Sequence, residues 1–115
     1  MQIDELRIWS VIDPPENTSL TSDRDVAIKD EPLTLNCGVS EPGQPAVEQY
    51  RWTRNGHVIT EINDAVWNVS QVTISYQANY TCTPVNEAGE GETAELELQV
   101  YGIDVYIFYV RVLLK

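Results

Sequence analysis

The sequence has 115 residues, a length that favours a single domain with one hydrophobic core. Hydrophobic residues make up 43% and charged residues 22% of the chain, an ordinary globular composition that excludes disorder. Acidic residues outnumber basic ones 18 to 7, and the net charge of −11 argues against nucleic acid or an anionic membrane surface as the main partner.

Short alternating runs of apolar and polar residues follow one another along the chain, with turn residues between them. In chain order these runs are 33–37, 50–53, 67–69, 78–82 and 96–100. Such alternation predicts strands with one buried face, and the Asn55-Gly56 pair predicts a tight hairpin. Many short strands without a helical period indicate an all-β protein, either an antiparallel sandwich or a barrel.

Side chains alternate across a strand, so position alone gives the inward-facing set. Its members are Leu33, Leu35, Cys37, Tyr50, Trp52, Tyr80, Cys82, Leu96, Leu98 and Val100. Two of the runs each contribute one cysteine to this shared interior. A disulfide across two sheets, packed on a tryptophan, is therefore expected.

Four residues have the order and spacing of a known family, namely Cys37, Trp52, Tyr80 and Cys82. They resemble an immunoglobulin-like domain of the immunoglobulin superfamily. Cys82, Asn86 and Gly89 are similar to the Cys-x-x-x-Asn-x-x-Gly signature of its I-set and C2-type members. The resemblance covers about residues 24–100 and implies a first strand somewhere in 7–16, so that the domain spans 7–100.

The resemblance implies an antiparallel β-sandwich of two sheets with an inter-sheet disulfide between Cys37 and Cys82. The alternative is a pair of buried free thiols, as in cytosolic muscle immunoglobulin domains. The implied core residues are Trp52, Tyr80, Leu35 and Trp67. Tyr80 takes the place of the corner tyrosine, whose hydroxyl bonds to a nearby backbone group.

The sequence departs from the family pattern at three places. Tyr76 stands where an aspartate is usual, so the salt bridge that this aspartate forms is expected to be missing. The short stretch between Gly56 and Trp67 favours one short strand near 57–60 instead of two strands. Trp67 itself occupies a position where leucine is commoner.

Asn-x-Ser/Thr sequons occur at Asn17, Asn68 and Asn79. Together with a disulfide pair they indicate the secretory route, and thus an extracellular or cell-surface location. By parity Asn68 and Asn79 both point outward, where each is available for glycosylation.

The outward face of the strands around 49–53, 79–83 and 95–97 is the candidate binding face, because adhesion molecules of this superfamily often bind through it. Its expected members are Gln49, Arg51, Thr53, Thr81, Thr83, Glu95 and Glu97. The face is polar and places an arginine near glutamates. Its alternative role is that of a solvated surface on a spacer domain.

The residue types that support catalysis or metal binding are scarce. One histidine and two cysteines leave a zinc site without ligands, and the glutamates after Asn86 lack the spacing of a calcium loop. His57 follows the Asn-Gly turn and is expected to be a solvated loop residue. We therefore expect no enzyme, no cofactor and no metal site.

The tail 101–115 contains an apolar stretch that is too short to span a bilayer. It is expected to be the start of a following domain or non-native sequence, with an extra strand as the other alternative. The chain as a whole is expected to recognise a like or unlike cell-surface protein, with weak self-association possible. The alternative is a structural spacer, including the cytosolic filament-associated kind.

Overall fold

The computed structural model describes residues 12–102, 110, 111 and 113, and these residues fold mainly as β-strands. The strands in chain order are β1 (Glu16–Ser22), β2 (Ala27–Ile28), β3 (Leu33–Glu41), β4 (Gln49–Arg54), β5 (His57–Val58), β6 (Val66–Val69), β7 (Ala78–Asn86), β8 (Gly89–Glu90), β9 (Ala94–Leu98) and β10 (Val100–Tyr101). A single 3-10 turn, η1 (Ile74–Tyr76), precedes β7. No helix among the described residues is long and apolar enough to cross a membrane.

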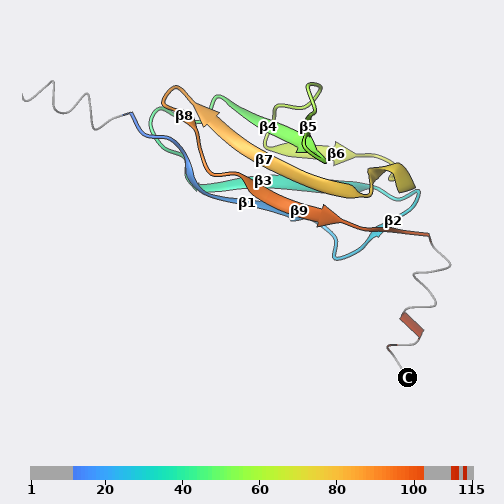
Figure 1. Cartoon of the computed structure of the whole chain (residues 1–115). Coiled ribbons are helices and arrows are strands. Elements are labelled where there is room, and N and C mark those ends of the chain that lie inside the picture. Colours follow the sequence, from blue (N-terminus) through green and yellow to red (C-terminus); the bar gives the residue numbers. More distant parts are fainter. Residues whose placement is uncertain (1–11, 103–109, 112, 114–115) are drawn as a thin grey trace, which may run out of the picture.

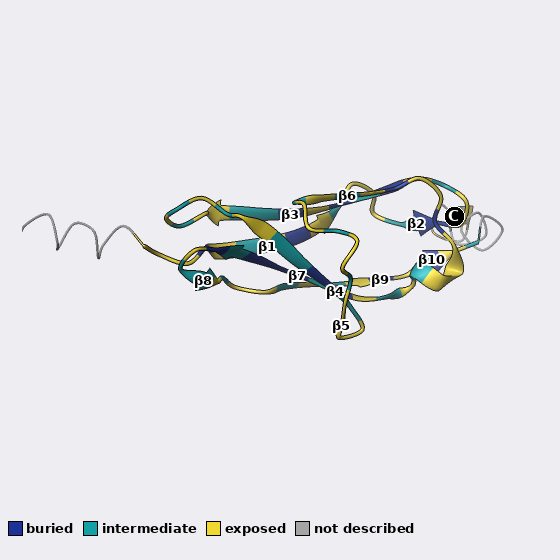
Figure 2. Cartoon of the chain, turned by 90° about the horizontal axis from the view of Figure 1, so that it is seen from above, coloured by how far each residue is buried: buried dark blue, intermediate teal, exposed yellow. Residues whose placement is uncertain are grey.

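Two antiparallel sheets form the body of the domain (Figure 1). The first has the order β1-β3-β6, and the second has the order β5-β4-β7, with both β8 and β9 paired to β7. A small parallel pair joins β2 to β10. In the view from above, ribbon segments coloured as buried occur in strands of both layers (Figure 2). The predicted all-β sandwich is confirmed.

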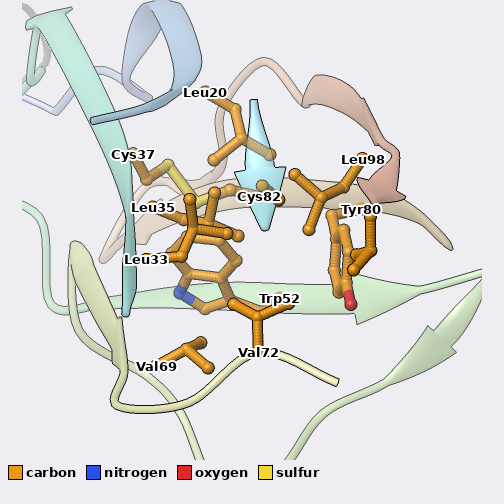
Figure 3. Close-up of a cluster of buried hydrophobic side chains, with 12 residues drawn as sticks. Leu20, Leu33, Leu35, Cys37, Trp52, Val69, Val72, Tyr80, Cys82 and Leu98 are labelled. Carbon is orange, nitrogen blue, oxygen red and sulfur yellow. A yellow bond between two sulfur atoms is a disulfide. The ribbon is translucent and has the colours of Figure 1, made fainter. Parts of the chain in front are cut away.

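The core lies between the sheets, where the inward faces of the alternating strands meet. Trp52, Tyr80 and Cys82 are fully buried, and Leu35 is 1% exposed. The disulfide between Cys37 and Cys82 joins β3 to β7 beside the Trp52 ring (Figure 3). The disulfide prediction is thereby confirmed and the alternative of two free thiols is wrong. The partly buried residues Tyr50, Trp67 and Leu96 pack against the edge of this core.

The first described strand begins at the end of the range expected for the first strand. That range was 7–16; β1 runs from Glu16 to Ser22 and pairs along β3, and within the range Asp13 forms an isolated bridge with Gln44. Only Leu20 of β1 is buried, so the strand is almost entirely polar and lacks an alternating apolar pattern. Residues 7–11 of the expected range lie outside the described part of the chain.

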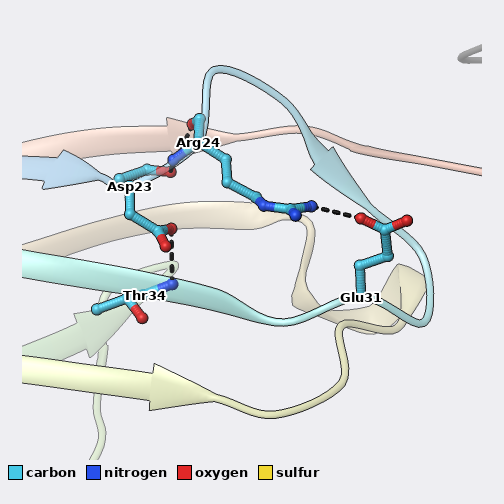
Figure 4. A network of polar contacts seen from close by, with 5 residues as sticks. Asp23, Arg24, Glu31 and Thr34 are labelled. Atoms are coloured by element: carbon cyan, nitrogen blue, oxygen red, sulfur yellow. Dashed lines mark hydrogen bonds and ion pairs between the residues drawn. The ribbon is translucent and has the colours of Figure 1, made fainter.

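The chain crosses between the two layers directly after β1, and polar contacts hold the crossing (Figure 4). The Asp23 carboxylate accepts a hydrogen bond from the Thr34 N–H at 2.9 Å, and the Asp23 N–H donates to the Thr34 oxygen at 3.0 Å. Arg24 forms an ion pair with Glu31. Beyond these contacts the chain leaves β3, and β2 pairs with β10.

One short strand follows the Asn55-Gly56 hairpin, as predicted from the short stretch before Trp67. This strand, β5, is limited to His57–Val58, and no further strand forms in the described residues 59–65. The loop after β5 instead ties the two sheets together. The Trp52 indole N–H donates to the Asp64 oxygen at 2.8 Å, and the Cys37 N–H donates to the Ala65 oxygen at 2.8 Å.

Most of the tail 101–115 lies outside the described residues.

Candidate functional site

The candidate binding face is the outer face of β4, β7 and β9, and the strand register shows which residues it brings together. Thr53 lies opposite Thr81, and Arg51 lies opposite Thr83. On the other side of β7, Glu95 lies opposite Thr81 and Glu97 lies opposite Asn79. Because residues that oppose each other across an antiparallel pair share a face, these side chains form one continuous polar surface.

Threonine pairs link the strands of this face. The hydroxyls of Thr53 and Thr81 are hydrogen-bonded to each other across β4 and β7. The hydroxyls of Thr83 and Thr93 are 2.6 Å apart on the other side of β7. Such cross-strand contacts contribute about 0.2–1 kcal/mol each and hold the side chains in a fixed arrangement. The face is therefore ordered although it is polar.

Arg51 is joined to Glu90, a residue that the sequence analysis did not place on the face. The Arg51 Nη2 and Glu90 Oε2 atoms are 2.6 Å apart, and both side chains are exposed by more than a third. An ion pair this exposed stabilises the domain by at most about 1 kcal/mol. Glu90 could have been located in advance, because the hairpin after Asn86 sets it opposite Val85 on the outer face.

Thr83 was expected to be exposed on the face, and this expectation is wrong. The residue is only 4% exposed, although it has the outward parity of Thr81. The reason is the position of its neighbours, because Arg51 and Glu90 extend from the strands on either side of β7 and meet across it. Thr83 therefore belongs to the face but is buried in it, while Gln49, Glu95 and Glu97 are exposed on the face.

A shallow hollow of about 810 Å³ opens on the same face, between Asn55, Thr81 and Glu95. Its end is formed by the β4–β5 hairpin, where Asn55 and Gly56 both have positive φ. The Asn55 carboxamide oxygen accepts from the Asn79 N–H at 2.9 Å. The Asn55 N–H in turn donates to the Asn79 oxygen at 2.7 Å. This turn is consequently fixed against β7, and the hollow has a rigid rim.

The rim of the domain near Tyr76 is closed by aromatic rings. The Trp67 ring meets the Tyr80 ring edge to face at 5.6 Å and the Tyr76 ring at 6.2 Å. The Arg54 guanidinium lies 6.0 Å from the centre of the Tyr76 ring. Tyr76 occupies the position where the family has an aspartate, and its ring contacts Arg54 at this rim. A cation–π contact thus links β4 to η1.

Tyr80 forms the corner expected from the resemblance, with its hydroxyl donating to the Tyr76 oxygen at 2.5 Å. Burial raises the pKa of the Tyr80 hydroxyl above its usual value, and the nearby Arg54 charge opposes this effect. The group is therefore neutral at physiological pH and acts as a structural hydrogen-bond donor.

Other candidate residues lie away from the face or at its end. His57 is exposed in the β4–β5 hairpin, and among the described residues no cluster of His, Cys, Asp or Glu side chains is able to hold a metal ion. Asn17 lies at the start of β1, Asn68 lies on β6, and Asn79 lies on the candidate binding face itself. All three asparagines are exposed.

Comparison with known proteins agrees with this architecture. The family model described as "Immunoglobulin domain" matches residues 14–100. The full ectodomain of mouse nectin-like molecule 4, with domains Ig1–Ig3, is similar at 25% identity and a TM-score of 0.63. The matched region covers 77% of this chain and 31% of that one, so the chain spans about a third of that ectodomain.

Two Dscam1 structures show the same fold. The N-terminal four immunoglobulin domains of isoform 4.44 match at 18% identity and a TM-score of 0.63, covering 76% of this chain and 21% of that one. The isolated Ig7 domain of isoform 9 matches at 22% identity and a TM-score of 0.61, covering 76% of this chain and all of that one.

Proposed function

Because the chain belongs to the immunoglobulin domain family, we propose that it is an extracellular recognition module that binds another protein through the outer face of β4, β7 and β9. The observation that carries the proposal is the ordered polar surface described above. Its threonine pairs and the Arg51–Glu90 ion pair hold side chains in fixed positions, and fixed side chains lose little entropy when a partner binds.

The location outside the cell is supported by two observations. The Cys37–Cys82 disulfide is of the kind that persists in oxidising compartments. The nectin-like structure that the chain resembles is an ectodomain. Both observations disfavour the cytosolic form of the spacer alternative.

The charge distribution suits recognition in which electrostatics selects the partner. Glu95 and Glu97 are exposed on the face and carry negative charge, and Arg51 contributes a positive charge to it. A partner that offers a cation to the glutamates and an anion to Arg51 would be selected, and a second copy of the same face can do both. No reaction is part of this proposal.

The test is charge reversal at Arg51, measured by sedimentation equilibrium on the glycosylated full chain across a wide concentration range. We expect concentration-dependent association that Arg51→Glu abolishes. Lys29→Glu is the matched control, since Lys29 is exposed after β2 and away from this face. The same variants are then compared for binding to intact cells, which detects an unlike partner. If Arg51→Glu and Lys29→Glu behave identically in both assays, the face is not the binding surface and the spacer alternative is favoured.

A further inference from the structure

Strand β6 (Val66–Val69) is an edge strand whose second side has no strand partner among the described residues. It is the last strand of the β1-β3-β6 sheet, and the described residues 59–65 before it contribute no strand. The register pairs Trp67 with Leu35, and the Cys37 N–H donates to the Ala65 oxygen. Along an antiparallel pair of strands, residues alternate between those that hydrogen-bond to the partner strand and those whose N–H and C=O groups point away from it. By this alternation Ala65 and Trp67 bond to β3. The N–H and C=O groups of Val66 and Asn68 therefore face the open edge.

Such an edge is a template for pairing with another chain, and proteins usually protect it with charge, proline or a covering segment. The edge strand of the other sheet, β9, carries Glu95 and Glu97. Strand β6 has the sequence Val-Trp-Asn-Val, with neither charge nor proline, and Val66 is 43% exposed. Neither charge nor proline therefore protects this side of the sandwich.

Asn68 is the acceptor asparagine of an Asn-Val-Ser sequon in the middle of this edge. Its carboxamide oxygen accepts a hydrogen bond from the Thr34 hydroxyl at 2.9 Å, and Thr34 lies directly opposite on β3. This bond uses the carboxamide oxygen and leaves the Nδ2 group out of the contact. Asn68 is an exposed residue, and it lies on the edge strand itself.

The other two sequons lie in different surroundings. The Nδ2 of Asn17 donates to Glu41 at 2.8 Å, and the Asn17 N–H donates to Glu92 at 2.7 Å, so this asparagine is held between two carboxylates. Asn79 lies beside the hollow on the opposite sheet. A sugar on either residue would leave the β6 edge open.

We propose that Asn68 carries an N-linked glycan that covers the open edge of β6 and prevents two copies from pairing through it. In the modification, a lipid diphosphate-linked oligosaccharide is the co-reactant. A bond forms between Asn68 Nδ2 and the anomeric carbon of the first sugar as the bond from that carbon to the diphosphate breaks. The lipid diphosphate leaves and Nδ2 loses one proton. The first sugar is then attached beside Val66, where it blocks the approach of a second strand.

The first measurement is peptide mass mapping of the full chain secreted from eukaryotic cells. We expect the peptide with Asn68 to carry a glycan, which enzymatic release converts to aspartate with a gain of about one mass unit. An unmodified Asn68 would overturn the proposal. Asn68→Gln should remove one glycan mass from the intact protein.

The second measurement is sedimentation equilibrium of the folded variants, with the intact disulfide and an unchanged melting temperature as the check on folding. We expect Asn68→Gln to raise the average mass toward that of two copies at concentrations where the parent and the control Asn17→Gln, which removes a sequon on β1 and away from both surfaces, remain monomeric. Enzymatic glycan removal from the folded parent should give the same shift if Asn68→Gln folds poorly. Adding Val66→Lys to Asn68→Gln should restore the monomer, because a lysine on the edge disfavours strand pairing.

Two results would overturn the shielding role. One is an Asn68→Gln protein with the same average mass as the parent at every concentration. The other is association of Asn68→Gln that Arg51→Glu abolishes and Val66→Lys does not, because that association would use the β4-β7-β9 face. The second result would support the proposed function while rejecting this inference, so the two proposals fail separately.

Discussion

The side-chain amide of Asn86 donates to the main-chain oxygen of Asp13, 73 residues earlier in the chain, at a distance of 2.6 Å. The same nitrogen donates to the Pro45 oxygen at 2.9 Å, and the Asn86 oxygen accepts from the Ala88 N–H at 2.9 Å. Asn86 is only 3% exposed, so all of these bonds are sheltered from water. One side chain thus joins the segment before β1, the segment before β4 and the β7–β8 hairpin.

Replacing Asn86 by alanine is expected to destabilise the domain by about 3 kcal/mol, because three partly buried backbone groups lose a hydrogen bond that is worth about 1 kcal/mol each. The measurement is urea unfolding followed by tryptophan fluorescence. Asn36→Ala is the matched control, since Asn36 is exposed on β3, and we expect it to change stability by less than about 0.5 kcal/mol. Equal stability of the two variants would show that the Asn86 network has no net effect.

Gly91 permits a close approach between the β8–β9 connection and the segment before β1. A Cβ atom at this position would lie 2.3 Å from the Pro15 oxygen. Pro15 is buried, so its backbone cannot move without disturbing the packing around it. We expect Gly91→Ala to cost about 1–3 kcal/mol, the range for overpacked sites, measured as a lower urea midpoint.

Gly102→Ala is the control for Gly91→Ala, because no atom in the described part of the chain lies within 4 Å of a Cβ at Gly102. Neither glycine has a positive φ, so the comparison isolates the steric effect from backbone strain. A Gly91→Ala protein as stable as Gly102→Ala would mean that the contact with Pro15 relaxes freely.

The buried hydroxyl of Tyr80 predicts a loss of stability in alkaline solution. Its pKa is raised above 10.0 in the folded protein, mainly by burial, so the unfolded chain ionises first as pH increases. The stabilisation is complete below pH 10 and is lost as pH rises through the folded pKa. Unfolding free energies measured between pH 8 and pH 11 should therefore fall more steeply for the parent than for Tyr80→Phe.

Tyr80→Phe also tests the hydrogen bond to the Tyr76 oxygen. Near pH 7 the variant should be less stable than the parent by about 1 kcal/mol, the usual net value of one such bond. The difference should then shrink above pH 10. Parallel pH profiles for the two proteins would contradict the assignment of the alkaline effect to Tyr80.

The most accurate predictions from the sequence concern strands in which buried and exposed residues alternate. Strand β3 shows this pattern, since Leu33, Leu35 and Cys37 are buried and Asn36 is exposed. The same alternation in β7 placed Cys82 opposite Cys37, so the disulfide followed from the pattern and the family resemblance together. Period and spacing were informative because each of these strands has one face in the core and one in water.

Where neighbours determined burial, the sequence was less informative. Strand β1 was not among the runs predicted from alternation, because it is polar except for Leu20 and its pairing depends on the backbone of β3. Thr83 was expected to be exposed because parity ignores long side chains that cross a strand from either side. The binding role of the face remains a prediction, since shape and charge define a surface without naming its partner.

Trp67 gives the sharpest test of how far family resemblance predicts stability. Leucine is commoner at this position, so resemblance alone predicts that Trp67→Leu is harmless or stabilising. In this domain, however, the Trp67 ring meets Trp52 edge to face at 5.7 Å and Tyr80 at 5.6 Å. Each such pair contributes about 0.5–1.5 kcal/mol beyond the area it buries.

We therefore expect Trp67→Leu to lose about 2 kcal/mol in urea unfolding, because a leucine at a half-buried site recovers little of what the ring contacts provide. The variant should also release the Tyr76 ring that lies against Arg54, so a second replacement, Arg54→Ala, should cost less in Trp67→Leu than in the parent. Ile74→Ala, at a side chain that is 60% exposed, is the control and should be nearly neutral. A Trp67→Leu protein at least as stable as the parent would show that the position follows the family rule and that the aromatic cluster adds nothing.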